Sequence, residues 1–380
     1  MKKLRVAVLY GGRSGEHEIS LQSAASVINY LDRDRFEIVP VAIDKRGRWH
    51  LNDISLLEGK KCLSVFKDAP NVVLPPNPAD MGSDSALIRL DESAEARGID
   101  VVFPVMHGPL CEDGTIQGLL ELADLPYVGC GVLASAVSMD KDMAKRVARD
   151  AGIPIVPYVS LKYELWKKEK QQFATNIAGQ LGYPVFIKPA NLGSSVGVHK
   201  VKEPGGLNAA LEDAFSYDRK VLVEAAVNAR EIEVSVLENL EAGGDPLVSI
   251  PGEIEPAHEF YSYEAKYLDE NGAALIIPAK LDPEETKRAQ EIGRKAFTVL
   301  ECEGMARVDL FLDRLSGKFF FNELNTIPGF TSISMYPKLW EASGINYQQL
   351  LSKLIDLAIS RHKKRKTLVR EFRIEKQHKS

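Results

Sequence analysis

The chain opens with apolar runs separated by turns, in the order strand, helix, strand. Leu4–Tyr10 is a nearly continuous apolar run, typical of a strand buried on both faces of a parallel sheet. After a glycine-rich turn, apolar residues recur at helical spacing from Ala24 to Leu31, and Ser20 is the expected helix cap. Phe36–Ile43 has the pattern of a second strand. This βαβ unit predicts a parallel sheet with a right-handed crossover.

Two further blocks of strands and helices follow. Val101–Met106 reads as another buried strand of the first unit, and Ser138–Asp150 as one helix capped by Ser138. Beyond a proline-marked linker, the pattern predicts a small α+β domain and then a third domain closed by a helix from Tyr347 to Arg361. The expected fold class is α/β and α+β, with an N-terminal Rossmann-like parallel-sheet domain. The expected boundaries are 1–137, 138–228 and 229–362, with a basic tail at 363–380.

The third domain contains the strongest chemical signal. Met305–Asp313 and Phe319–Leu324 have the pattern of two strands joined by a Ser-Gly turn. Because side chains alternate along a strand, Arg307 and Asp309 share one face, and so do Glu323 and Asn325. Apolar residues expected on the same faces favour a partly buried hairpin over one with its charges in water: Phe311, Phe319 and Phe321.

Paired strands would bring these side chains to a single cavity. The oxygens of Asp309, Glu323 and Asn325 suit Mg²⁺, which prefers a few carboxylates together with phosphate oxygens and water. Arg307 beside such a metal suits a reaction in which negative charge builds on oxygen. The hairpin therefore predicts a metal–nucleotide enzyme that activates an acid.

A glycine- and serine-rich loop, Asn191–Gly197, lies between two predicted strands. Its N–H groups, including those of Ser194 and Ser195, could bind phosphate, although an ordinary β-turn has the same composition. Lys188, at the end of the preceding strand, could reach the same phosphates or point into water. Glu224 and Glu231 at strand ends could contact the nucleotide or be solvated.

Other candidates lie in loops. Glu16 and His107 each follow a parallel strand, where ligands bind, and Glu16 could hold an ammonium group; a lone histidine is more often structural. Lys266 and Tyr267 lie in a long polar loop. This loop could be a lid, which loops of this length often form, or a disordered surface loop. The turn after the hairpin, residues 326–334, could offer the Gly329 N–H to an oxyanion and the Ser334 hydroxyl to a carboxylate. It could also simply cap a helix.

The composition limits the general binding partners and the cellular location of the protein, but it identifies no further site residue. The chain is 45% hydrophobic and 27% charged, and its net charge of −5 gives no general attraction to nucleic acid or membrane. The four cysteines show no metal-ligand spacing and read as reduced thiols. No apolar run approaches the roughly 20 residues that span a bilayer, and the N-terminus lacks a signal-peptide pattern. A cytoplasmic location is expected.

Taken together, these segments resemble the D-alanine–D-alanine ligases of the ATP-grasp superfamily. One departure is Cys111, where the family usually has glycine. The matching segments occur in the order usual for that family: GGRSGEHEIS (Gly11–Ser20), HGPLCEDGTIQG (His107–Gly118), PYVGCGVLASAVSMDK (Pro126–Lys141), IKPANLGSSVGV (Ile187–Val198), YEAKY (Tyr263–Tyr267), RVDLF (Arg307–Phe311) and NELNTIPGFTSIS (Asn322–Ser334).

The resemblance implies a three-domain ATP-grasp architecture and an ATP-dependent carboxylate–amine ligase. ATP would phosphorylate the first D-alanine, and the amine of the second would attack the acylphosphate to give a precursor of peptidoglycan. Two Mg²⁺ ions, replaceable by Mn²⁺, are implied at Asp309, Glu323 and Asn325. The expected partners are ATP and D-alanine, with no nucleic acid or membrane, in a homodimer.

The same resemblance implies roles for the remaining candidates. Glu16 would hold the first ammonium, within a hydrogen-bonded group with Ser194 and Tyr267 that shuts the site, and Arg307 and the Gly329 N–H would stabilise the oxyanion. His107, Lys266 and Ser334 would bind substrate, the last two at the second carboxylate. Nucleotide contacts would come from Lys141, Lys188, Ser195, Glu224 and Glu231.

Two alternatives remain open at the level of sequence. The chain could be an ATP-grasp ligase for another acid and amine, although Glu16, Lys266 and Ser334 are all present. It could also be a non-catalytic nucleotide-binding protein, which the complete metal and arginine positions argue against. Within the family the second substrate also varies between D-alanine, D-serine and D-lactate, and the YEAKY segment resembles the D-alanine-specific members.

Overall fold

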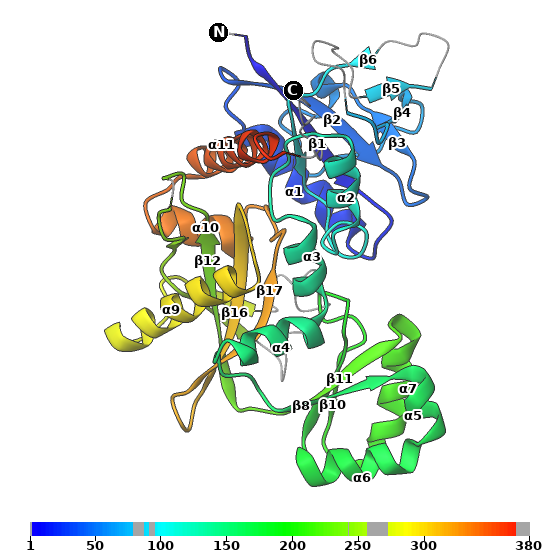
Figure 1. The fold of residues 1–380 in the computed structure, drawn as a ribbon, viewed down its shortest axis with the longest axis vertical. Helices are drawn as coiled ribbons and strands as arrows, with labels where there is room; N and C mark the ends of the chain where they lie inside the picture. The colour runs from blue at the N-terminus through cyan, green and yellow to red at the C-terminus, as the bar shows by residue number, and fades with distance from the viewer. Residues whose placement is uncertain (1, 79–86, 91–95, 242, 257–272, 370–380) are drawn as a thin grey trace, which may run out of the picture.

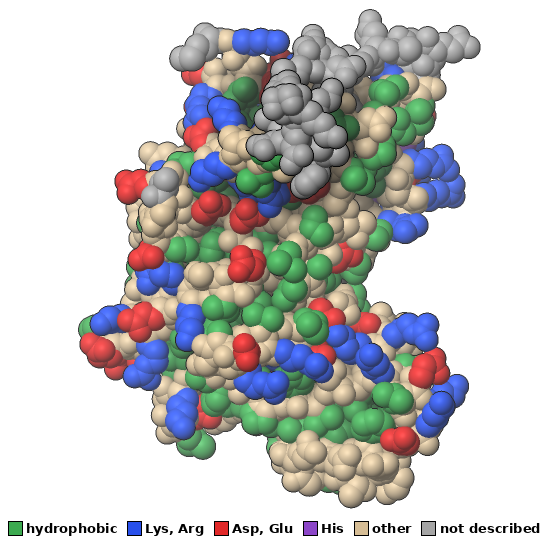
Figure 2. Space-filling model, viewed as in Figure 1, with side chains coloured by type: hydrophobic (Ala, Val, Ile, Leu, Met, Phe, Trp, Pro, Cys, Tyr) green, Lys and Arg blue, Asp and Glu red, His purple; other side chains and the backbone are tan. Residues whose placement is uncertain are grey.

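The computed structural model describes residues 2–78, 87–90, 96–241, 243–256 and 273–369. Across these residues the strands form three sheets, of seven, four and six strands. Figure 1 shows the first sheet at one end of the molecule, the third in the middle and the second at the other end. Over the face shown in Figure 2, basic and acidic side chains are interspersed rather than gathered by sign.

The first sheet confirms the parallel βαβ prediction. β1 (Leu4–Gly11) pairs in parallel with β2 (Phe36–Ile43) and β7 (Val101–Pro104), and α1 (His17–Tyr30) makes the crossover. The sequence predicted Ser20 as the cap of α1, but its hydroxyl does not cap this helix. It lies within the helix and accepts a hydrogen bond from the Gly11 N–H at 2.7 Å. Short antiparallel strands extend the sheet beyond β2: β3 (Trp49–Leu51), β4 (Asn71–Val73), β5 (Leu87–Arg89) and β6 (Ala96–Arg97).

The single helix expected over Ser138–Asp150 is two helices. α3 (Val132–Met139) ends where α4 (Lys141–Asp150) begins. The side chain of Asp140 accepts hydrogen bonds from the N–H groups of the first turn of α4, so Asp140, not Ser138, is the cap. The break places Lys141 at the start of a helix. α2 (Thr115–Leu122) precedes this pair.

The second sheet is antiparallel, in the order β10, β9, β11, β8. β9 (Val185–Pro189) and β10 (His199–Val201) flank the glycine- and serine-rich loop as predicted, and β11 (Lys220–Ala225) pairs with β9. The apolar face packs on helices around the buried Trp166. The sequence reading had not identified the edge strand or the two helices after it: β8 (Tyr158–Lys162), α5 (Tyr163–Lys168) and α6 (Lys170–Gln180). α7 (Leu207–Tyr217) completes this unit.

The third sheet is antiparallel, with β12 (Ala229–Leu237) and β16 (Met305–Asp313) at its centre. α9 (Pro283–Val299) packs against these strands and begins with a capping box between Asp282 and Glu285. The outer strands and the following helix are β17 (Phe319–Asn325), β14 (Gly252–Pro256), β15 (Ala273–Ile276), β13 (Leu247–Val248) and α10 (Met335–Ala342).

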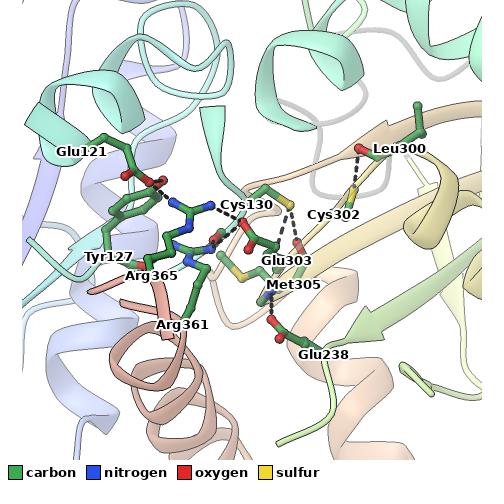
Figure 3. Close-up of polar contacts among 12 residues, drawn as sticks. Glu121, Tyr127, Cys130, Glu238, Leu300, Cys302, Glu303, Met305, Arg361 and Arg365 are labelled. Carbon is green, nitrogen blue, oxygen red and sulfur yellow. Dashed lines mark hydrogen bonds and ion pairs between the residues drawn. The ribbon is translucent and has the colours of Figure 1, made fainter. Parts of the chain in front are cut away.

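The last helix joins the first and third units. α11 (Tyr347–Lys366) continues past the expected end at Arg361, and its apolar face belongs to the core of the first sheet. Arg361 donates to the backbone oxygens of Tyr127 and Gly129, and Arg365 pairs with Glu121 (Figure 3). The Nη2 atom of Arg365 also lies 3.0 Å from Oε2 of Glu303, which belongs to the third unit. These contacts fix the two units against each other.

Candidate active site

One face of the third sheet is apolar and the other is charged, because side chains alternate along β12 and β16. On β16, Val308 and Leu310 are buried in the core under α9. Arg307 and Asp309 alternate with them and therefore point to the opposite face. On β12 the same alternation sets Ile232, Val234 and Val236 against Glu231, Glu233 and Ser235. The charged face is a direct consequence of the sequence pattern.

A β-bulge in β17 corrects one expectation about the hairpin. Asp309 lies opposite Glu323, but Leu310 lies opposite Phe321, so Asn322 is an extra residue in β17. The alternation therefore shifts, and Phe319 and Phe321 are buried in the core instead of sharing the face of Glu323. Asn322 and Glu323 both line the cleft as a result.

The cleft lies between the second and third sheets and has a volume of about 580 Å³. Phe186 of β9 and Phe311 of β16 give it apolar walls. It gathers eight of the predicted site residues from segments distant in sequence: Lys141, Lys188, Ser194, Ser195, Glu224, Glu231, Asp309 and Glu323. Such a mixture of apolar walls and convergent charges is typical of a small-molecule site.

Arg307 is paired with two carboxylates. Its Nε and Nη2 atoms each donate to an oxygen of Asp309 at 2.7 Å, and its Nε lies 3.1 Å from Glu233 Oε2. Burial alone would lower the pKa of Arg307, but the two carboxylates raise it well above its usual range. The guanidinium is thus a fixed positive charge beside Asp309, which lines the cleft.

Glu224, which lines the cleft, holds two lysines. Its Oε2 atom accepts from Lys188 Nζ at 2.7 Å, and its Oε1 atom lies 3.0 Å from Lys145 Nζ. Burial by itself would raise the pKa of Glu224, but the two ammonium groups lower it to about 2. Lys188 also donates to Asn322 Oδ1 at 3.3 Å, which connects β9 to the bulge in β17.

Lys141, at the start of α4, connects the loop to the hairpin. Its Nζ atom donates to the Leu192 carbonyl at 2.6 Å and lies 3.1 Å from Glu323 Oε2. In the loop itself, Ser194 and Ser195 adopt left-handed φ values of 54° and 58°. Such backbone conformations cost energy for residues other than glycine and cluster at ligand-binding loops.

Glu16 and Ser194 meet although they belong to different units. The Ser194 hydroxyl donates to the Glu16 carboxylate. Gly108 has a φ of +78°, which favours glycine, and a Cβ atom there would come within 2.7 Å of Glu16 Oε2 and displace this carboxylate. The ammonium candidate thus lies beside the loop that borders the cleft.

His107 is buried behind this position. Its Nε2 atom lies 3.1 Å from Ser23 Oγ and its Nδ1 atom 3.6 Å from Glu112 Oε1. Burial would lower the pKa of His107, but the carboxylates of Glu112 and Glu16 raise it. Cys111, the departure from the family pattern, is buried and does not adopt a positive φ, so its backbone does not require glycine.

Gly329 and Ser334 lie together in the turn after β17. A Cβ atom on Gly329 would approach Ser334 Oγ to 2.7 Å. The Ser334 hydroxyl accepts from the Thr331 N–H at 3.0 Å, which holds the turn closed. Asn325 Oδ1 accepts from the Ile327 N–H at 3.1 Å and so orders the chain between hairpin and turn. Lys266 and Tyr267 lie outside the described residues.

Three residues in or next to the cleft are not predicted by the sequence pattern. Lys145 and Glu233 are buried partners of predicted residues, and Asn322 is the bulged residue of β17. Glu233 could have been found, since it alternates with Glu231 in an otherwise apolar strand. Lys145 carried no such signal, because a lysine on a helix is usually exposed.

The donor set fits Mg²⁺ bound together with phosphate. Within the described residues, no group of three or more His, Cys, Asp or Glu side chains has the arrangement of a metal site. Asp309 and Glu323 are cross-strand neighbours, and Asn325 lies opposite Arg307. Two carboxylates and an amide are too few to enclose a metal but match Mg²⁺, which completes its shell with phosphate oxygens and water.

Comparison with known proteins agrees with this geometry. Residues 5–130 match the family profile described as "D-ala D-ala ligase N-terminus", and residues 147–356 the one described as "D-ala D-ala ligase C-terminus". A D-alanine–D-alanine ligase A from Bradyrhizobium diazoefficiens is 55% identical, with 97% of this chain and 99% of that protein covered. A D-alanine–D-alanine ligase from Shouchella clausii is 49% identical, with 97% and 98% covered.

Solved structures give the same result. The D-alanine–D-alanine ligase from Coxiella burnetii superposes with a TM-score of 0.80 at 38% identity, covering 97% of this chain and 98% of that one. The VanG D-Ala:D-Ser ligase from Enterococcus faecalis superposes with a TM-score of 0.81 at 37% identity, covering 94% and 100%. With both profiles matched and near-complete coverage at up to 55% identity, the chain belongs to the D-alanine–D-alanine ligase family.

Proposed function

We propose that this chain joins two D-alanine molecules into D-alanyl-D-alanine, converting ATP to ADP and phosphate, for the synthesis of peptidoglycan precursors. The observation that carries the proposal is the cleft lined by Asp309, Glu323, Lys141 and Lys188, with Arg307 hydrogen-bonded to Asp309. That arrangement occurs on a chain 55% identical to a D-alanine–D-alanine ligase over nearly its full length.

The nucleotide would occupy the cleft between the second and third sheets. Lys188 and Lys141 would neutralise phosphate charge, with the N–H of Ser195 adding a donor from the loop. Glu231, at the start of β12, would accept from ribose hydroxyls, and Glu224 would accept from adenine while holding Lys188. Phosphoryl transfer needs such positioning and charge neutralisation more than covalent help.

The first D-alanine would bind where the N-terminal unit faces the loop. Its ammonium would pair with Glu16, which the Ser194 hydroxyl already orients. The buried His107 would support this position from behind. One carboxylate oxygen of the first D-alanine would then attack the γ-phosphorus of ATP, giving an acylphosphate and ADP.

The second half of the reaction forms the peptide bond. The neutral amine of the second D-alanine attacks the acylphosphate carbon, phosphate leaves from the tetrahedral intermediate, and the proton released from the nitrogen passes to the leaving phosphate. Arg307 and the Gly329 N–H would stabilise the oxyanion of that intermediate, since donors fixed where charge develops lower the barrier most. The acylphosphate hydrolyses in water, so a lid carrying Tyr267 would be needed to close the site.

Asp309, Glu323 and Asn325 would hold two Mg²⁺ ions, or Mn²⁺ in their place. When bound, the metal neutralises charge on the transferring phosphate. The chain itself supplies the ligands and, through Lys141 at 3.1 Å from Glu323, a second cation against the same carboxylate. Pairing with Lys141 balances the negative charge of Glu323 when no metal is bound.

The second substrate is D-alanine in this proposal, with Lys266 and Ser334 binding its carboxylate. A D-serine alternative has one specific observation in its favour, because VanG, described as a D-Ala:D-Ser ligase, shares the fold at 37% identity. The sequence YEAKY at 263–267 favours D-alanine.

We further propose that the protein acts in the cytoplasm as a homodimer, on small molecules alone. ATP use supports the location, and the net charge of −5 supports the exclusion of nucleic acid. Within the described residues, no helix combines the length and the apolar character needed to cross a bilayer.

The deciding experiment measures phosphate release from ATP and Mg²⁺ with D-alanine, L-alanine, D-serine or D-lactate, and identifies products by mass. Phosphate release with D-alanine alone and a D-alanyl-D-alanine mass would establish reaction and substrate. Turnover only in mixtures of D-alanine with D-serine or D-lactate would change the second substrate. ATP binding without turnover in any mixture would indicate a non-catalytic protein.

A further inference from the structure

Glu233 is a buried carboxylate that the reaction outlined above does not use. It lies on β12, directly opposite Asp309 on β16, with its side chain only 6% exposed. Its Oε2 atom lies 3.1 Å from Arg307 Nε. Removing a carboxylate from water costs several kcal/mol unless a strong partner compensates. Arg307 is that partner, which makes Glu233 part of the environment of the oxyanion-binding guanidinium.

Arg307 and a bound metal ion would both use the same two oxygens of Asp309. Both oxygens are hydrogen-bonded to Arg307, at 2.7 Å each. A metal ion at Asp309 would compete with the guanidinium for those oxygens, because carboxylate lone pairs are shared between all their partners. If Asp309 alone held Arg307, binding the metal would loosen the arginine at the stage when its position matters most.

Glu233 removes this conflict. Its Oε2 atom, on a different strand, lies 3.1 Å from Arg307 Nε. The Nε–H that now donates to Asp309 can therefore turn to Glu233 when a metal ion takes up the Asp309 oxygens. Once a metal ion draws Asp309 away from Nη2, the terminal Nη groups become available to the reacting oxygens while the orientation of the side chain is fixed from β12. We propose that Glu233 is a positioning residue: it anchors Arg307 through Nε so that Asp309 can bind metal without loss of the oxyanion-binding geometry.

This inference rests on the proposed ligase activity but makes a separate prediction. In Glu233→Ala, kcat should fall about ten- to a hundredfold, the range for residues that orient groups at a metal site. KM for ATP and D-alanine should change by less than about threefold, since the effect acts on the transition state. Glu233→Gln should lose less, because its amide oxygen can accept from the Nε–H once Asp309 binds the metal.

Two binding measurements separate positioning from other roles. A phosphinate dipeptide that mimics the tetrahedral intermediate should bind Glu233→Ala more weakly by the same factor as the loss in kcat/KM. The affinity for Mn²⁺, followed by electron paramagnetic resonance, should stay within about threefold of the parent value. A parallel loss of Mn²⁺ affinity would make Glu233 a metal ligand and overturn the proposal.

A matched control is available on the neighbouring strand. Glu253 of β14 forms an equally buried pair, with its oxygens 2.7 and 2.6 Å from Arg230, and lies opposite Ile232. Glu253→Gln should lower the melting temperature as much as Glu233→Gln does, with kcat and phosphinate affinity near the parent values. Equal kinetic losses in both variants, or none in Glu233→Ala, would overturn the positioning role. Failure of the parent protein to make dipeptide would instead refute the proposed function.

Discussion

The Ser194 hydroxyl donates a hydrogen bond to the Glu16 carboxylate, across 178 residues of sequence. Glu16 follows the first strand of the N-terminal unit, and Ser194 belongs to the loop between β9 and β10. The bond joins the expected ammonium site to the loop that borders the proposed nucleotide cleft. Binding of the first D-alanine and closure of the loop are therefore expected to depend on each other.

Removing this hydroxyl should weaken the use of D-alanine more than the binding of ATP. A hydrogen bond to a charged group contributes about 1.5–3 kcal/mol, so Ser194→Ala should lower kcat/KM for D-alanine about ten- to a hundredfold. The ATP dissociation constant, measured by calorimetry, should change little. Equal losses for both ligands would mean that the loop itself had been disrupted.

Lys188 and Lys145 provide a matched pair of substitutions. Both contact Glu224, but only Lys188 lines the cleft. Lys188→Met should weaken ATP binding by about 2 kcal/mol, or about thirtyfold. Lys145→Met should lower the free energy of unfolding by about 3 kcal/mol, because it removes one partner of a buried charge, with ATP affinity within about threefold. The reverse result would place the nucleotide elsewhere.

Glu224 should make the stability of the protein depend on pH in acid. Its pKa falls from 4.5 to about 2 on folding, because two lysines outweigh its burial. A lowered carboxylate pKa adds stability that is complete above pH 4.5 and is lost as pH falls toward 2. The contribution is about 3 kcal/mol.

Urea unfolding between pH 7 and pH 2.5 tests this contribution in the parent and in Glu224→Gln. The difference in unfolding free energy should be largest above pH 5 and should shrink below pH 4.5. A difference that stays constant over the whole range would show that the carboxylate charge does not stabilise the fold.

Arg361 should be required for stability and not for catalysis. It donates to the backbone oxygen of Tyr127 at 2.7 Å, and its Cζ atom lies over the Tyr127 ring, 4.5 Å from the ring centre (Figure 3). Arg361→Ala leaves buried carbonyls without a donor and should cost about 3 kcal/mol of unfolding free energy. Lys363→Ala, at an exposed position of the same helix, should cost under about 0.5 kcal/mol. Both variants should keep kcat at temperatures where they remain folded.

Arg307→Ala tests the oxyanion role directly. Loss of one preorganised donor typically lowers kcat by about 10²–10³-fold, and ATP should still bind because the proposed nucleotide contacts lie on Lys141 and Lys188. Single-turnover measurement of phosphate release would detect the effect. Undiminished turnover would exclude Arg307 from the reaction.

Periodicity alone determined the elements that carry the site. The alternation in Met305–Asp313 assigned Arg307 and Asp309 to one face, and the antiparallel pairing with β17 confirmed the predicted hairpin. The parallel βαβ unit and the loop between β9 and β10 were equally predictable. These features depend on neighbours in sequence, so the sequence contains the information that specifies them.

What the tertiary structure decided concerns neighbours in space. The bulge at Asn322 shifts the alternation of β17, so Phe319 and Phe321 face the core. Asp140 replaced Ser138 as a cap because α3 and α4 pack as separate helices. Lys145 and Glu233 became part of the site only because folding buried them against Glu224 and Arg307. A buried charge requires an opposite charge beside it, and only the folded chain determines which residue supplies it.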